Sequence, residues 1–356
     1  MERAPVKATV LEGRGALAYR DVPTPEPGPG EVLLQVRASA VCGSDIHRFV
    51  RGHRTYPMIL GHEAAGVITA AGPGADPGLV GRHAALVPLV PDHTCPECLA
   101  GRFSACGTYT FIGSRRAGAF AEYVALPAEN AFLVPDEMPF AAAALIEPST
   151  VARHMLDLGS FVAGQSAVVF GAGSIGLMLV QWLRILGASL VVASDVVDAN
   201  LDVARSLGAH VALNPTRDDV PAAVRRLLPA GVDLALEAAG SPAALAQTIE
   251  VARPRGSVVL GGNQPADASL SMIFVESLMR RELRLSGCFM SYSAPWPGHE
   301  WRDGLAAVLD GGLDMAAMIS HRAPLGDAPA IFEAIGERRL AHRKIVFDPS
   351  PGSADA

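Results

Sequence analysis

At 356 residues, the chain is long enough to form two domains. Half of its residues are hydrophobic and 18% are charged, which supports a large folded core and excludes an intrinsically disordered chain. A net charge of -7 argues against a nucleic-acid-binding protein, which would present a basic face.

The N-terminal part, up to about residue 145, predicts an irregular β-rich domain. Its opening stretch, MERAPVKATV, lacks the apolar segment of a secretory signal, so we expect a cytoplasmic protein. Apolar runs of strand length alternate with turn-rich connectors such as PTPEPGPGE and AGPGADPG. The strands are expected at residues 7–12, 31–41, 64–72, 121–127 and 131–135.

From residue 166 onward, strands alternate with helices, which predicts an α/β fold with a doubly wound parallel sheet. The strands are expected at residues 167–170, 190–195, 210–214, 232–240, 257–262 and 282–287. The helices are expected at residues 174–187, 199–208, 219–229, 242–254 and 271–281. The tail from about residue 291 combines helices at 304–312 and 330–339 with a strand at 344–348, and we expect it to pack on the first domain.

The run from Phe161 to Leu183 carries no charged residue and is long enough to suggest a membrane span. Its glycines, however, divide it into a strand, a turn and a helix. We therefore expect no membrane-spanning segment.

The sequence GAGSIG predicts a dinucleotide site between the first strand and first helix of the α/β part. In this pattern the first glycine permits a tight turn, the second lets the backbone approach a pyrophosphate, and the third allows close packing. Asp195 ends the next strand, where an acid binds the adenosine ribose and repels a 2′-phosphate, so NAD is favoured over NADP. The residues expected to bind the cofactor are Gly171, Gly173, Ser174, Ile175, Gly176 and Asp195.

Three of the five cysteines, Cys95, Cys98 and Cys106, lie close together as C-x2-C-x7-C. In a chain without secretory features, such clustering indicates metal binding or burial rather than disulfides. A closed structural zinc site has four ligands, so the three thiols are one ligand short.

The chain resembles the zinc-dependent medium-chain dehydrogenases along nearly its whole length. The motifs that carry this resemblance occur in the order found in that family: CGSD-H, GHE, the cysteine segment, IEP and GAGSIG. The resemblance implies a GroES-like catalytic domain, at residues 1–148 and 291–356, and a Rossmann NAD-binding domain at residues 149–290. It also implies a catalytic zinc with Cys42 and His62 as ligands. Glu63 and Glu147 would be the carboxylates that complete or alternate in its shell.

The same resemblance gives roles to the residues around this zinc. Asp45 would orient His62 and raise its basicity. Ser44 would receive the proton of the alcohol, and His47 would pass that proton toward solvent, as suits a side chain with a pKa near neutrality. The resemblance further implies a homodimer or homotetramer paired through sheet edges near ELRLSGCFM.

In the family, the cysteine segment reads C-x2-C-x2-C-x7-C, and this pattern places Asp92 in the first position of the lobe at residues 90–107. Zinc accepts carboxylate oxygen, so we expect a structural zinc held by Asp92, Cys95, Cys98 and Cys106, making two zinc ions per chain. His93 is a rival fourth ligand, although it lies one residue out of register.

Stretches such as FIGSRRAGAFAEY and SYSAPWPGHEW resemble the branch of the family that oxidises galactitol 1-phosphate. This implies a polyol or polyol phosphate as substrate, and Arg115 and Arg116 are candidates to bind its phosphate. A cyclitol, an aminocyclitol or a cyclitol phosphate is an alternative substrate. A zinc-free or non-catalytic member of the fold is an alternative of another class.

Overall fold

The protein's structure, a computed structural model, describes residues 4–263 and 272–350. The chain divides into two compact units. Unit 1 comprises residues 1–147, 292–301 and 318–356, and unit 2 comprises residues 148–291 and 302–317. Ser271, with which one predicted helix begins, lies outside the described residues.

Unit 1 is built mainly from antiparallel strands, as the sequence predicts for a β-rich domain. Its largest sheet has the order β10-β6-β5-β3-β18-β17, with β9 also paired to β3. A second sheet has the order β2-β1-β4, and β7 pairs with β8. The strands are β1 (Val6–Gly13), β2 (Ala16–Val22), β3 (Glu31–Ala40), β4 (Met58–Ile59), β5 (Glu63–Ala71), β6 (His83–Leu86), β7 (Leu89–Val90), β8 (Thr110–Phe111), β9 (Tyr123–Pro127), β10 (Ala131–Leu133), β17 (Ile319–Pro324) and β18 (Lys344–Asp348).

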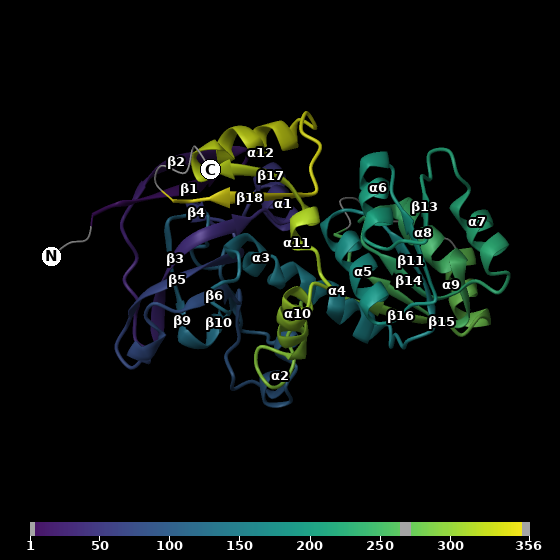
Figure 1. Ribbon diagram of the computed structural model, residues 1–356, viewed down its shortest axis with the longest axis horizontal. Helices are drawn as coiled ribbons and strands as arrows, with labels where there is room; N and C mark the ends of the chain where they lie inside the picture. The colour runs from purple at the N-terminus through teal and green to yellow at the C-terminus, as the bar shows by residue number, and fades with distance from the viewer. Residues whose placement is uncertain (1–3, 264–271, 351–356) are drawn as a thin grey trace. The chain divides into compact units, whose positions relative to one another are not determined.

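The C-terminal strand β18 lies between β3 and the edge strand β17 in the large sheet. Helix α12 lies next to α1 and β2 (Figure 1). An aromatic cluster of Phe49, Phe120, Phe332 and Phe347 fills the core there. The tail therefore packs on the first domain in this region, as expected. The helices that lie wholly in unit 1 are α1 (Gly43–Arg51), α2 (Pro96–Leu99), α3 (Phe140–Ala144) and α12 (Ala328–Gly336).

Unit 2 contains a six-stranded parallel sheet within the described residues, with helices along its connections (Figure 1). The strand order β13-β12-β11-β14-β15-β16 is that of a doubly wound dinucleotide-binding fold. The strands are β11 (Ser166–Phe170), β12 (Leu190–Ser194), β13 (Val211–Leu213), β14 (Val232–Glu237), β15 (Ala252–Leu260) and β16 (Arg284–Gly287). The helices are α5 (Ser174–Ile185), α6 (Asp198–Ser206), α7 (Val220–Leu227), α8 (Pro242–Val251) and α9 (Met272–Arg280).

The central strands of this sheet are buried on both faces, which explains their continuous apolar sequences such as AVVF and LVVA. The uncharged run at 161–183 becomes β11 and α5. Among the helices that the structure describes, none is long and apolar enough to span a bilayer. The run is therefore the core strand and first helix of the parallel sheet.

Residues 302–317 belong to unit 2 rather than to the catalytic part that the sequence predicts for the whole tail. Two polar contacts within unit 2 explain this placement. The backbone nitrogen of Asp314 donates to Oε1 of Gln181 at 2.6 Å, and Arg153 contacts Asp303 at 3.2 Å. The helices on these boundaries are α4 (Ile146–Leu158), α10 (His299–Leu309) and α11 (Met315–Met318).

Candidate functional site

The register of the large sheet in unit 1 brings together two segments that carry predicted zinc ligands. Ala40, the last residue of β3, pairs with Glu63, the first residue of β5. This pairing therefore places Cys42, two residues after the end of β3, close to His62, which directly precedes β5. The Sγ of Cys42, a ring nitrogen of His62 and a carboxylate oxygen of Glu63 all lie within 4.8 Å of one another.

Local structure fixes the orientation of both segments. Cys42 is the N-cap of α1, and its backbone nitrogen donates to Oδ2 of Asp45 at 3.1 Å in a capping box. Gly61, with a φ of 90°, turns the chain into His62. A Cβ atom at Gly61 would lie 2.5 Å from the ring of Phe120, so only glycine fits there.

Asp45 lies beside His62, as the sequence predicts. Its Oδ1 is 3.5 Å from Nδ1 of His62, and both side chains are buried. Burial lowers the pKa of His62, but Asp45 and Cys42 outweigh it and raise this pKa well above its usual range. The surroundings of the ring therefore favour positive charge, which suits a cation site formed by sulfur, nitrogen and oxygen ligands.

The buried Lys344 binds Glu63, a contact that sequence reasoning did not predict. Its Nζ donates to the two carboxylate oxygens of Glu63 at 2.7 and 2.9 Å and to the carbonyl oxygen of Val41 at 3.0 Å. Lys344 and Glu63 are at most 2% exposed. The lysine thus connects the two segments that carry Cys42 and His62. The only available signal was its rarity, because the chain has one other lysine, Lys7.

Glu147 is buried near this cluster but is not part of it. Burial raises its pKa to about 7, although the nearby His62 has the opposite effect. Glu63 adds a like charge that also raises this pKa, and Lys344 acts against it. A carboxyl group with such a pKa is close to the balance between its neutral and charged forms at neutral pH.

Arg48 contacts Ser44, the first residue of the predicted proton path. Its Nη1 donates to Oγ of Ser44 at 2.8 Å and lies 3.5 Å from Oδ1 of Asp45. His47 is exposed on the same helix. Sequence reasoning missed Arg48 because an arginine four residues after a serine on a surface helix usually points into solvent and makes no functional contact.

In the cysteine lobe, the ligand atoms of Asp92, Cys95, Cys98 and Cys106 all lie within 4.8 Å of one another. Oδ1 of Asp92 accepts hydrogen bonds from the backbone nitrogens of Thr94 and Cys95, both at 2.8 Å, and Oδ2 accepts one from Thr108. The Thr108 hydroxyl, followed by the two backbone groups, lowers the pKa of Asp92 below its usual range.

Burial and the neighbouring thiols raise the pKa of Cys98 to about 12, so a metal that binds this thiolate has to displace a tightly held proton. The rival ligand His93 is otherwise engaged, because its Nε2 lies 2.9 Å from Glu129 and its ring packs against Phe103 and Trp296. The four ligand atoms that lie close together are therefore those of the predicted set, with Asp92 in the first position of the motif.

The glycine loop of unit 2 has the geometry of a dinucleotide site. Gly171 has a φ of 93° and would place a Cβ 2.7 Å from the backbone of Ala239, and a Cβ at Gly176 would lie 1.7 Å from the carbonyl oxygen of Gly171. A Cβ at Gly173 would meet no atom within 4 Å. The space at Gly173 and the buried, unpartnered Oγ of Ser174 in the described residues fit a pyrophosphate at the N-terminus of α5.

Ile175 lies in the first turn of α5, and Asp195 follows β12. The Asp195 carboxylate accepts hydrogen bonds from the backbone nitrogens of Ala172 at 2.7 Å and Val197 at 2.8 Å. These bonds hold the acid against the glycine loop, where the sequence predicts it to meet a ribose.

The two arginines predicted to bind phosphate differ in their contacts. Nη2 of Arg116 donates to Glu31 at 2.9 Å and to the carbonyl oxygen of Ala125 at 2.8 Å. Arg115 is exposed and its guanidinium stacks on Tyr109 at 3.8 Å. Both lie in the turn after Phe111, whose ring is 5.5 Å from that of His62.

Comparison with known proteins agrees with these features. Residues 28–136 match the family described as alcohol dehydrogenase GroES-like domain, and residues 174–309 match zinc-binding dehydrogenase. The chain is 39% identical to galactitol 1-phosphate 5-dehydrogenase of Escherichia coli K12 over 295 residues, which are 82% of this chain and 85% of that protein.

The chain is a zinc-binding medium-chain dehydrogenase. As a member of this family it is an enzyme of the alcohol and polyol dehydrogenase class, with a GroES-like unit and a Rossmann unit. The predicted family and fold class are thereby confirmed.

Further relatives show how broad this dehydrogenase family is. L-threonine 3-dehydrogenase of Anaeromyxobacter dehalogenans is 32% identical over 97% of this chain and 98% of its own length. Galactitol-1-phosphate dehydrogenase from E. coli has a solved structure with a TM-score of 0.91 and 35% identity, covering 96% of this chain and all of that one. A zinc-binding dehydrogenase from Sinorhizobium meliloti bound to NADP has a TM-score of 0.89 and 31% identity over 98% of this chain and 100% of its own.

Proposed function

We propose that this dehydrogenase uses zinc and NAD to oxidise a secondary hydroxyl of a polyol or polyol phosphate, similar to galactitol 1-phosphate, to a ketone. The observation that carries the proposal is the buried cluster of Cys42, His62 and Glu63. Zinc held there would polarise the substrate hydroxyl and lower its pKa. Lys344 holds both oxygens of Glu63, so in this proposal Glu63 lies beside the zinc without binding it. The nearby buried Glu147 would then complete the ligand set with Cys42 and His62.

We assign the proton of the alcohol to Ser44. Arg48 donates to Oγ of Ser44, which leaves the hydroxyl hydrogen free to point elsewhere and stabilises negative charge on that oxygen. His47, exposed on the same helix, takes the proton to solvent. Asp45 orients His62 through its Nδ1 side, which leaves Nε2 as the ligand atom.

For the phosphate of a polyol phosphate we propose Arg115. Its partner in the motif, Arg116, is already paired with Glu31, whereas Arg115 is exposed and held flat by Tyr109. An arginine presented in this way can bind a phosphate with two parallel hydrogen bonds.

A substrate panel tests the proposal. Reduction of NAD is measured with polyol phosphates, the matching free polyols, cyclitols, aminocyclitols, cyclitol phosphates and L-threonine. We expect kcat/KM to be highest for a polyol phosphate, and Arg115→Ala to raise its KM at least about tenfold while the KM of the free polyol stays the same. If the enzyme oxidised only unphosphorylated cyclitols, or only L-threonine, the proposal that its substrate is a polyol phosphate would be rejected.

Cofactor choice depends on Asp195 in this proposal. The NADP-bound relative shows that this fold can accept NADP, so we expect Asp195→Ala to lower the preference for NAD over NADP by about 10- to 100-fold. The ratio of kcat/KM for the two cofactors measures this. Asp202→Ala is the matched control, because it removes a nearby exposed acid that pairs with Arg205. An equal change in this variant would contradict the role of Asp195.

We also propose a structural zinc held by Asp92, Cys95, Cys98 and Cys106. Metal analysis should then find two zinc ions per chain. Asp92→Ala is expected to lower this to about one and to reduce the melting temperature, whereas Asp92→Cys should retain both ions because it restores four thiolates. Two tightly bound zinc ions in Asp92→Ala would show that the carboxylate is not a ligand.

A homodimer through β16 completes the proposal. This strand lies at the edge of the six-stranded sheet. Exposed apolar side chains lie on it or close to it in the sequence, with Leu285 42%, Phe289 72% and Met279 74% exposed. An open edge with apolar neighbours favours pairing with a second copy. Sedimentation equilibrium that finds only monomers would reject this assembly.

We also propose a cytoplasmic location. The structural zinc proposed for the lobe requires reduced thiols, and such thiols are typical of the cytoplasm.

A further inference from the structure

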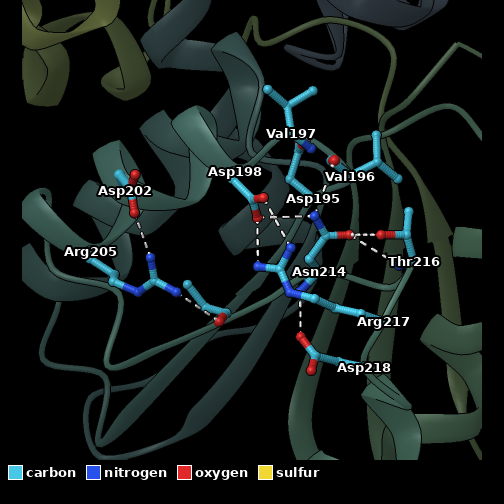
Figure 2. A network of polar contacts seen from close by, with 11 residues as sticks. Asp195, Val196, Val197, Asp198, Asp202, Arg205, Asn214, Thr216, Arg217 and Asp218 are labelled. Atoms are coloured by element: carbon cyan, nitrogen blue, oxygen red, sulfur yellow. Dashed lines mark hydrogen bonds and ion pairs between the residues drawn. The ribbon is translucent and has the colours of Figure 1, made fainter.

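Asn214, directly after β13, is a fully engaged polar side chain in unit 2. It is 3% exposed, and its Nδ2 donates to the carbonyl oxygen of Val196 at 3.1 Å and to Oδ1 of Asp198 at 3.0 Å. Its Oδ1 accepts from the backbone nitrogen and the hydroxyl of Thr216, at 3.0 and 2.8 Å (Figure 2). A primary amide has two donor hydrogens and two acceptor positions, so all of them are used and the orientation of the side chain is fixed.

The segment that Asn214 holds is the turn that carries Asp195 (Figure 2). This turn joins β12 to α6, and its Val196 and Val197 are 63% and 41% exposed. With little apolar packing of its own, the turn depends on polar contacts for a single conformation. The bond from Asn214 to Val196 acts on the residue next to Asp195.

We propose that Asn214 is a positioning residue for the adenosine end of the dinucleotide. By fixing the turn after β12, it keeps the carboxylate of Asp195 where the ribose hydroxyls bind. This inference rests on the proposed use of NAD. Asn214 has no contact with the cofactor in this role, and it acts only through Asp195.

A neighbouring ion pair is a weaker candidate for the same role. Arg217 binds Asp198 with two nitrogens, at 2.6 and 2.9 Å, but their side chains are 55% and 59% exposed. Solvent-exposed ion pairs contribute little to fixing a conformation, because water and salt screen them. The buried amide of Asn214 is not screened in this way, and Arg217 therefore provides a control.

The test uses Asn214→Asp in the full-length, zinc-loaded enzyme. Aspartate has the same shape and can still accept from Thr216, but it cannot donate to Val196 and adds a negative charge beside Asp198. Calorimetry with ADP-ribose, which contains the adenosine half without nicotinamide, should show affinity reduced at least about tenfold. The KM for NAD should rise by the same factor, while kcat and the KM for the alcohol stay unchanged. Should Asn214→Asp fail to fold, Asn214→Ser replaces it, with a smaller loss expected because one donor remains.

A double-mutant cycle separates positioning from a general structural role. In an Asp195→Ala background, Asn214→Asp should change ADP-ribose affinity by less than about twofold, because the residue through which it acts is gone. Arg217→Ala alone should also change it by less than about twofold. A tenfold loss that persists without Asp195, or a lower melting temperature with unchanged ADP-ribose affinity, would overturn the inference. Wild-type protein that fails to bind ADP-ribose would instead reject the proposed use of NAD.

Discussion

Replacing Cys42 with serine is expected to lower kcat/KM by at least about a thousandfold, which is roughly 4 kcal/mol of transition-state stabilisation. A serine hydroxyl stays protonated near neutral pH and is a poor zinc ligand, so the catalytic zinc should be lost. The zinc content measured by metal analysis should fall from two ions per chain to about one. A cooperative thermal unfolding transition should show that the variant is still folded.

The control for this change is Cys288→Ser, which alters a cysteine outside both clusters. It should keep both zinc ions and full turnover. If Cys42→Ser retained full activity with one zinc, the zinc mechanism would be wrong, and the zinc-free alternative for this fold would regain support.

Lys344→Met should destabilise the protein by about 3–5 kcal/mol, because it leaves the buried carboxylate of Glu63 without its cation. Denaturant unfolding of the zinc-free protein measures this free energy without a contribution from the metal. The double variant Lys344→Met with Glu63→Gln should recover most of the loss, since a neutral amide is less costly to bury than an unpaired charge.

Lys7→Met is the matched control, because Lys7 pairs with Asp21 at the surface, where both side chains are more than 40% exposed. Its removal should leave unfolding nearly unchanged. Equal stability of wild type and Lys344→Met would contradict this prediction, because it would show that Glu63 does not need the lysine as a counter-charge.

The fold of unit 2 and its glycine loop could be predicted because both depend on local sequence. Gly171, Gly173 and Gly176 act within one turn, and the buried strands β11, β12 and β14 appear as apolar runs of strand length. The predicted strands and helices therefore correspond closely to those of the structure. The tail was harder, because the association of residues 302–317 with unit 2 depends on contacts such as Asp314 with Gln181 that leave no local pattern.

The candidate zinc cluster was found through family motifs, since periodicity alone gives no reason for Cys42 and His62 to meet. Their proximity follows from the pairing of Ala40 with Glu63, a register that only the folded sheet reveals. Lys344 lies 281 residues from Glu63 in the chain, and a single lysine at the start of a strand carries no signal of such a partner. Arg48 escaped notice for a similar reason, because its contact with Ser44 looks like ordinary helix spacing.

The carboxylate at position 92 also limits what oxidation can do to the lobe. The metal-binding set that we propose for it contains three thiols, an odd number, because Asp92 occupies the remaining position. If the proposed zinc is lost under oxidising conditions, Cys95, Cys98 and Cys106 can close at most one disulfide among themselves, which leaves one thiol unpaired. A lobe with four cysteines could instead form two disulfides and leave no free thiol. The remaining thiol is a nucleophile next to any disulfide that forms, so exchange within the lobe offers a route back to the reduced, metal-binding state.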